Sequence, residues 1–256
     1  MGLFDKKYCD VCNGKIGLLG NRKLEDGNLC KDCAKKLSPF FSERRRSTIA
    51  DIENQLAYRE ENKALVSKFN ITRTLGLGTK VLLDEDAGKF IVTSARRWQE
   101  ENPDVLDFSQ VTGCNVDVDE RQRELKRRDK DGREVSYNPP RRVYSYDFNM
   151  VIHVNSPWFD EIRFRLNSST IEIEPPAGRV WMQGGADVGR RSVEYRECEA
   201  LGEEIKQALT QVRQQVRESV AAANAPKVAQ TCPLCGATTT PDASGRCEYC
   251  GGAMQG

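Results

Sequence analysis

The chain has 256 residues, enough for one large domain or for two or three small ones. Its formal net charge is +1 although 30% of its residues are charged, so no global field drives it onto a nucleic acid or a membrane. No apolar run approaches the roughly 20 residues that a membrane-spanning helix needs, and residues 1–7 lack the apolar stretch of a signal peptide. We therefore expect a cytoplasmic protein, whose cysteine pairs bind metal rather than form disulfides.

Eight of the ten cysteines lie in four Cys-x-x-Cys pairs, which form one set of four near each end of the chain. Two thiols separated by two residues can turn inward from one tight turn, so two such pairs supply the four corners of a tetrahedron. Four thiolates are the ligands of a closed structural zinc site. The sequence therefore predicts two zinc ions per chain, held by Cys9, Cys12, Cys30 and Cys33 at one end and by Cys232, Cys235, Cys247 and Cys250 at the other.

Residues 1–40 are predicted to form the first zinc module. Two short strands, 15–19 and 22–29, follow the first cysteine pair, and the second pair falls where 34–37 can continue as a helical turn. Thiolates suit a helix N-terminus, because its free N–H groups and dipole favour negative charge. This layout resembles a treble-clef finger. The 17-residue gap equals that of GATA-type fingers, but their Trp-Arg and Asn-Ala pairs are missing here, so a structural or protein-binding role is favoured over DNA reading.

Residues 41–75 are predicted to form a connecting segment with an amphipathic helix over 42–69. Its intermittent apolar stripe consists of Ile49, Ile52, Leu56, Leu65 and Phe69. Thr48 and Asp51 form a capping signal for a late start. Arg44, Arg45 and Arg46 lie where the helix dipole disfavours cations, which makes them candidates for an anion-binding patch together with Lys35 and Lys36. A solvated charge run, with the helix beginning after it, is the favoured alternative.

From residue 79 the apolar period changes to two, which predicts strands at 80–84, 89–93, 111–118, 144–154, 161–166 and 170–174, followed by a helix over 192–223. Nine Lys and Arg residues lie in the segment 119–142, which we interpret as a solvated hairpin tip between strands. Antiparallel strands closed by one C-terminal helix resemble a pleckstrin-homology-type barrel. The resemblance rests on element order alone, and a β-sandwich with an appended helix is the alternative.

The predicted fold class is therefore α+β with several domains. A pleckstrin-homology-like β-barrel with its capping helix is expected over 76–222 and a short linker over 223–230. Residues 231–256 are predicted to be a zinc ribbon, with Gly236 and Gly251 after its cysteine pairs to supply the positive φ of tight turns.

The sequence offers little for catalysis. His153 is the only histidine and lies on the polar side of its strand, so Ser-His-Asp and Cys-His chemistry lack parts. The two cysteines outside the pairs, Cys114 and Cys198, fall on apolar faces and are expected to act as small buried hydrophobic residues. The segment 184–189 lacks the Lys-Ser/Thr that a phosphate-binding loop requires. We therefore expect no enzyme and no small-molecule substrate.

The chain is similar to an uncharacterised group of bacterial proteins. That group begins with a four-cysteine domain that continues into a Lys/Arg-rich helical stretch, often followed by a pleckstrin-like or other small module. The resemblance covers about the first 65 residues and is carried by Cys9-Asp10-Val11-Cys12, Lys15-Ile16-Gly17, Leu24 to Gly27 and Leu29-Cys30-Lys31-Asp32-Cys33. It implies no activity.

Three functions follow as hypotheses. The leading one is a non-enzymatic, zinc-stabilised interaction or scaffold protein that binds protein partners. The second is nucleic-acid binding through the basic residues after the first zinc site. The third is recognition of an anionic lipid surface by the segment 119–142, with Arg127 and Arg128 as candidate contacts.

Overall fold

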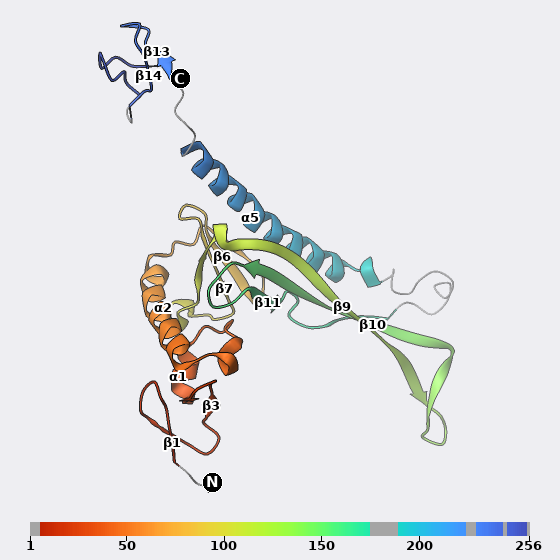
Figure 1. Cartoon of the computed structure of the whole chain (residues 1–256). Helices are drawn as coiled ribbons and strands as arrows, with labels where there is room; N and C mark the ends of the chain where they lie inside the picture. The colour runs from red at the N-terminus through yellow and green to blue at the C-terminus, as the bar shows by residue number, and fades with distance from the viewer. Residues whose placement is uncertain (1–5, 175–188, 224–228, 243–244, 255–256) are drawn as a thin grey trace. The chain divides into compact units, whose positions relative to one another are not determined.

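The computed structural model describes residues 6–174, 189–223, 229–242 and 245–254, and along 211–223 it describes the backbone alone. The chain divides into two compact units, residues 1–214 and 215–256, whose boundary lies inside helix α5 (Val193–Ala223). The predicted mixture of helices and antiparallel sheets is confirmed (Figure 1). Across the described ranges, no helix is both long and apolar enough to cross a membrane.

Four two-residue strands and one short helix build the N-terminal module. The elements are β1 (Lys7–Tyr8), β2 (Lys15–Ile16), β3 (Arg22–Lys23), β4 (Asn28–Leu29) and α1 (Lys31–Lys36). β1 pairs with β2, and β3 pairs with β4, so the two segments expected to form one hairpin belong to two separate small sheets. The module has its own core, which consists of Cys9, Ile16, Leu24, Leu29, Cys33, Leu37 and, from the following helix, Ile52.

The connecting helix begins later than its apolar pattern suggests. Residues Glu43–Arg46 form a 3-10 turn (η1), and helix α2 then runs over Ile49–Lys68. Thr48 caps it in a capping box, because its Oγ1 accepts from the Asp51 N–H and Asp51 Oδ2 accepts from the Thr48 N–H at 2.9 Å. The prediction that the helix begins after Arg44 to Arg46 is therefore confirmed. The Asp26 carboxylate also accepts from the Ile49 N–H at 2.8 Å, which attaches the first module to the helix start.

We predict that Asp51→Ala lowers the free energy of unfolding of the first unit by about 1 kcal/mol, because it removes one half of the capping box. Denaturant unfolding followed by circular dichroism measures this loss. Glu61→Ala is the matched control, since Glu61 is an exposed acid in the middle of the same helix. Equal stability of the two variants would show that the box contributes nothing.

The buried face of α2 is only partly apolar. It consists of Ile52, Gln55, Arg59, Asn62 and Val66, whereas Leu65 of the predicted stripe is 38% exposed. The expected stripe is therefore rotated from the observed one. The reason is that three polar side chains on this helix have partners inside the fold or lie fully enclosed in it, which a search for apolar residues cannot detect.

A buried polar network joins α2 to its neighbours. Arg59 forms an ion pair with Asp104 at 2.8 Å, and its Nε donates to the backbone carbonyl of Lys36 at the end of α1. Asp104 also accepts a 2.7 Å hydrogen bond from the Ser38 hydroxyl. Asn62 donates to the Pro103 carbonyl at 2.7 Å and accepts from the backbone N–H of the residue after Asp104. The network therefore holds the N-terminal module, α2 and the following sheet in one body.

The first large sheet has four antiparallel strands in chain order: β5 (Arg73–Leu75), β6 (Lys80–Asp84), β7 (Lys89–Thr93) and β8 (Val105–Asp107). The predicted strands 80–84 and 89–93 are confirmed at both ends. β5 and β8 were not predicted, because three residues are too few to show a period. The short helix α3 (Trp98–Glu101) and the 3-10 turn η2 (Phe108–Gln110) complete this part.

The second large sheet consists of β9 (Val111–Arg128), β10 (Glu134–Val154), β11 (Glu161–Arg165) and β12 (Ile171–Ile173). β9 occupies one edge of β10, while β11 and β12 share the other edge. Among the described strands, none of this sheet pairs with the first sheet, so both sheets are open and the predicted closed barrel is wrong. The two sheets instead share one apolar core, which includes Val81, Leu83, Phe90, Phe148, Met150 and Ile152, and Ile205 and Leu209 from α5.

The segment 119–142 is not a loop. β9 and β10 stay paired as far as Arg128 and Glu134, and the turn at 129–133 closes on the Asp129 carboxylate, which accepts from the backbone N–H groups of Asp131 and Arg133. Beyond Tyr144 towards this turn, the one described strand that pairs with β10 is β9. We call residues 123–143 the arm (Figure 1). The predicted helix over 192–223 is confirmed as α5.

Candidate metal centres and basic surface

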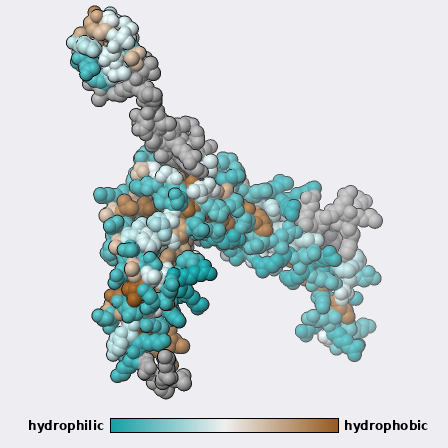
Figure 2. All heavy atoms as spheres, in the orientation of Figure 1, coloured by the Kyte–Doolittle hydropathy of each residue, from teal (hydrophilic) through white to brown (hydrophobic). Residues whose placement is uncertain are grey.

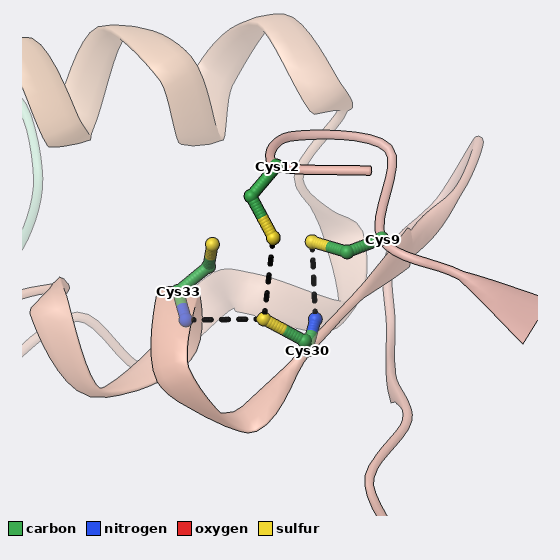
Figure 3. Close-up of side chains that lie close together, drawn as sticks. All are labelled: Cys9, Cys12, Cys30 and Cys33. Carbon is green, nitrogen blue, oxygen red and sulfur yellow. Dashed lines mark hydrogen bonds between the residues drawn. The ribbon is translucent and has the colours of Figure 1, made fainter. Parts of the chain in front are cut away.

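The first four-cysteine set comes together as predicted. The ligand sulfurs of Cys9, Cys12, Cys30 and Cys33 all lie within 4.8 Å of one another, and the side chains converge on one point between the first turn and the start of α1 (Figure 3). Cys30 is the N-cap of α1, where its sulfur accepts from the Cys33 N–H, and Cys9 accepts from the Cys30 N–H, both at 3.3 Å. The helix start therefore directs N–H groups at two sulfurs of the set.

The second set is built in the second unit from two tight turns, next to the small sheet of β13 (Gln230–Thr231) and β14 (Thr238–Thr239). Its four sulfurs also lie within 4.8 Å of one another. The Cys232–Cys250 and Cys235–Cys247 sulfur pairs are 3.6 and 3.7 Å apart. These cysteines are free, since a disulfide has a sulfur separation of about 2.05 Å.

Three of the four cysteine pairs use the same backbone turn. Gly236 and Gly251 follow their pairs with φ of +70°, as predicted, and Asn13 follows the first pair with φ of +55°. In each turn the residue after the pair donates its N–H to the carbonyl of the first cysteine, at 2.8–2.9 Å. A positive φ is accessible to glycine and, among other residues, most readily to asparagine and aspartate. The fourth pair, at 30–33, lies on a helix start instead and needs no such turn.

The thiols of each set differ in acidity. Burial raises the pKa of the Cys9 thiol, but hydrogen bonds from the backbone N–H groups of Cys30, Cys12 and Val11 outweigh burial and lower it to about 7. Backbone N–H groups of Cys235 and Leu234 lower the pKa of Cys232 to about 6. Burial and the neighbouring thiols raise the pKa of Cys33. Each set thus contains one thiol that ionises readily, and the thiolate is the form that binds metal.

Both sets fit a tetrahedral metal ion. Zinc–sulfur bonds of about 2.3 Å place the corners of a tetrahedron about 3.8 Å apart. Three sulfur separations are 3.6–3.7 Å, between Cys12 and Cys30 in the first set and in the two pairs of the second. Four thiolates at this spacing form a ligand set with the size and chemistry of structural zinc.

The candidate anion-binding residues do not form one patch. Lys35 and Lys36 are exposed in the last turn of α1, and Arg46 pairs with Glu43 on the surface. Arg44 and Arg45 line a cavity of about 630 Å³ with the β3 residues Arg22 and Lys23. The sequence prediction missed the two β3 residues, although two consecutive basic residues in a predicted hairpin were a signal. Arg127 and Arg128 lie on the arm, exposed.

The remaining candidates lie where the sequence places them. His153 is exposed on β10, while its neighbours Ile152 and Val154 are buried. Cys114 and Cys198 pack, half-buried, against the large core. Burial raises the pKa of Cys114 to about 12, so this thiol stays protonated near neutral pH. Both behave as small hydrophobic residues, in agreement with the prediction.

The geometry defines a class of protein that carries two closed four-thiolate centres, one in each unit. Comparison with known families agrees for the first of them. A family model described as a domain of unknown function (DUF4428) matches residues 7–55, which include the first cysteine set, η1 and the start of α2. The resemblance inferred from the cysteine pattern is confirmed for this segment. No curated protein and no solved structure matches the chain.

Proposed function

We propose that this protein binds two structural zinc ions and acts by docking protein partners, without catalysing a reaction. The observation that supports the proposal is that both cysteine sets are complete, with four sulfurs within 4.8 Å of one another. A catalytic zinc keeps one coordination position open for water or substrate, whereas four protein thiolates fill a tetrahedral ion. In each site the bound zinc would supply a cross-link between two cysteine pairs.

The surface of the first module carries an apolar tip that supports the docking role. Leu18 and Leu19 follow β2 and are 90% and 82% exposed. Burial of a leucine side chain in a partner's apolar pocket is favourable by about 1.5–3 kcal/mol, and this tip presents two adjacent leucines to water. We therefore place the main protein contact at this loop.

Chemical crosslinking of the zinc-loaded protein in cells, followed by mass spectrometry, tests the docking role. We expect the Leu18→Ser/Leu19→Ser variant to lose crosslinks at residues 15–23 while its zinc content stays unchanged. The matched control is Leu77→Ser, because Leu77 is 72% exposed in a different loop. Crosslinks that survive the double substitution, or that are equally weakened by Leu77→Ser, would contradict a contact at this tip.

A second candidate function is duplex nucleic-acid binding through the arm. Hydrophilic residues cover most of the arm (Figure 2), with eight Lys and Arg against four Asp and Glu over 123–143. Alternation along β9 puts Lys126 and Arg128 on one face and Arg127 on the other. A B-form major groove admits a two-stranded ribbon and has phosphates on both walls, whereas a lipid surface is flat and meets one face.

The arm has a test of its own. Arg127→Glu/Arg128→Glu should abolish binding of a random DNA duplex at low salt, and Arg96→Glu/Arg97→Glu, with the same change in net charge, should not. Binding to anionic vesicles with no binding to the duplex would favour the lipid alternative instead.

A further inference from the structure

We propose that the cavity between β3 and η1 in the N-terminal module is a binding site for an oligophosphate group. The cavity has a volume of about 630 Å³ and is lined by Asn21, Arg22, Lys23, Leu24, Glu25, Arg44 and Arg45. Four of these seven residues are basic and one is acidic. The site lies wholly within the segment matched by the domain of unknown function, and it is independent of the docking role proposed above.

Two segments about 20 residues apart in sequence bring these cations together. Arg44 is half-buried, and its guanidinium donates to the backbone carbonyl of Lys23 at 3.3 Å, which ties η1 to β3. The backbone N–H of Glu25 also donates to the carbonyl of Ser47 at 3.0 Å. The cations therefore face a common space because the backbone around them is fixed by hydrogen bonds.

The four cations outnumber the one acidic residue of the lining, Glu25. Over the described residues, Arg22, Lys23, Arg44 and Arg45 make no ion pair, although most arginines of the large sheets do. Burial and then the charges of Arg22 and Arg45 lower the pKa of Arg44. Like charges held this close destabilise one another, and a multiply charged anion between them would remove the repulsion. The repulsion between these charges therefore destabilises the folded protein and favours binding of an anion at this site.

The lining also restricts the chemistry of the ligand. Arginine guanidinium groups match phosphate oxygens in geometry, since two N–H groups can donate in parallel. The cavity is in the size range of small-molecule pockets, about 300–1,000 Å³, and so has room for more than one phosphate. None of its seven residues is aromatic, so the cavity has no aromatic ring that would stack on a nucleobase. An oligophosphate chain, free or at the end of a larger molecule, meets these conditions.

One further atom supports a ligand at this place. The side-chain oxygen of Asn21 is buried and has no hydrogen-bond partner, while its nitrogen donates to Asn28 at 2.8 Å. A buried acceptor without a partner destabilises the fold, because it has lost its hydrogen bonds to water. A hydroxyl of the ligand, or a water that bridges to it, would satisfy this oxygen.

Isothermal titration of the full-length, zinc-loaded protein with inorganic triphosphate tests the proposal. We expect saturable binding that weakens as salt rises. Lys23→Gln and Arg45→Gln should each reduce the affinity about tenfold, the effect of one charge-assisted hydrogen bond. Both side chains are exposed, so neither substitution should affect folding. Zinc content measured before and after titration shows that triphosphate has not extracted the metal.

Arg46→Gln is the matched control, because Arg46 is the next residue, carries the same charge and lies outside the cavity lining, paired with Glu43. It should leave the affinity unchanged. ATP should bind no tighter than triphosphate, since the lining offers no aromatic ring to the base. The proposal is overturned if triphosphate shows no binding at about 1 mM, where a free energy near −4 kcal/mol would be detected. It is equally overturned if all three variants bind alike, or if only a DNA duplex or a polyglutamate peptide binds.

Discussion

Cys33→Ser will unfold the N-terminal module and leave the two large sheets folded. Cys33 is 5% exposed and belongs both to the four-sulfur set and to the module's core. That core contains only seven buried residues, and structural zinc supplies about 10 kcal/mol or more of apparent binding free energy to modules of this size. Since a core of this size supplies little stability of its own, loss of one ligand should remove most of the stability of the module.

Hydrogen exchange with mass spectrometry measures this effect segment by segment. We expect amides of 7–37 to exchange rapidly in the variant, together with the first turn of α2, whose Ile52 completes the core. Amides of β6, β7 and β10 should keep their protection. Cys114→Ser is the control, since it makes the same substitution at a half-buried thiol outside both sets. Retained protection over 7–37 in Cys33→Ser would show that the module folds without its fourth ligand.

Asp104→Ala will destabilise the first unit by about 3–5 kcal/mol, because it leaves a buried arginine without its counter-charge. The side chains of Arg59 and Asp104 are 6% and 0% exposed, and their atoms are 2.8 Å apart. Asp104 also holds Ser38, so the substitution breaks the link from α1 through α2 to the first large sheet. Arg59→Ala should be less harmful, since the remaining carboxylate can take up a proton.

Denaturant unfolding followed by tryptophan fluorescence reports on this junction, because Trp98 packs against Phe69 at the C-terminal end of α2 and Trp158 packs against Tyr58 in the middle of the helix. Glu60→Ala is the control. Glu60 forms an equally short ion pair with Lys63, at 2.6 Å, but their side chains are 67% and 59% exposed. An exposed pair contributes between 0 and about 1 kcal/mol. A similar loss in the free energy of unfolding for Asp104→Ala and Glu60→Ala would mean that burial of the Arg59–Asp104 pair adds nothing to its contribution to stability.

Structural features that depend on a few neighbouring residues could be predicted from the sequence. The strands of the first hairpin, 80–84 and 89–93, each contain a short run of apolar residues, and the turn between them ends in Gly88, whose φ is +67°. The start of α2 is predicted by the capping signal of Thr48 and Asp51, which are three residues apart. The two cysteine sets follow from spacing alone, because a pair in a tight turn has few other ways to place its sulfurs.

Structural features that depend on pairing between distant segments could not be predicted from the sequence. Strand order does not state whether sheets close, so a run of antiparallel strands suggested a barrel where two open sheets exist. The arm was interpreted as a solvated hairpin tip between shorter strands, because charged residues occupy both faces, yet its strands pair through the backbone, which needs no burial. The contribution of Arg22 and Lys23 to the basic cavity depends on the packing of β3 against η1.

The metal content of the protein tests the central claim most directly. After anaerobic purification, elemental mass spectrometry should find two zinc ions per wild-type chain. Cys12→Ser and Cys235→Ser, each at an exposed ligand of one set, should retain one zinc ion, and the double variant none. One ion or none in the wild-type protein, or a wild-type content that neither substitution lowers, would contradict the assignment of both cysteine sets as zinc sites.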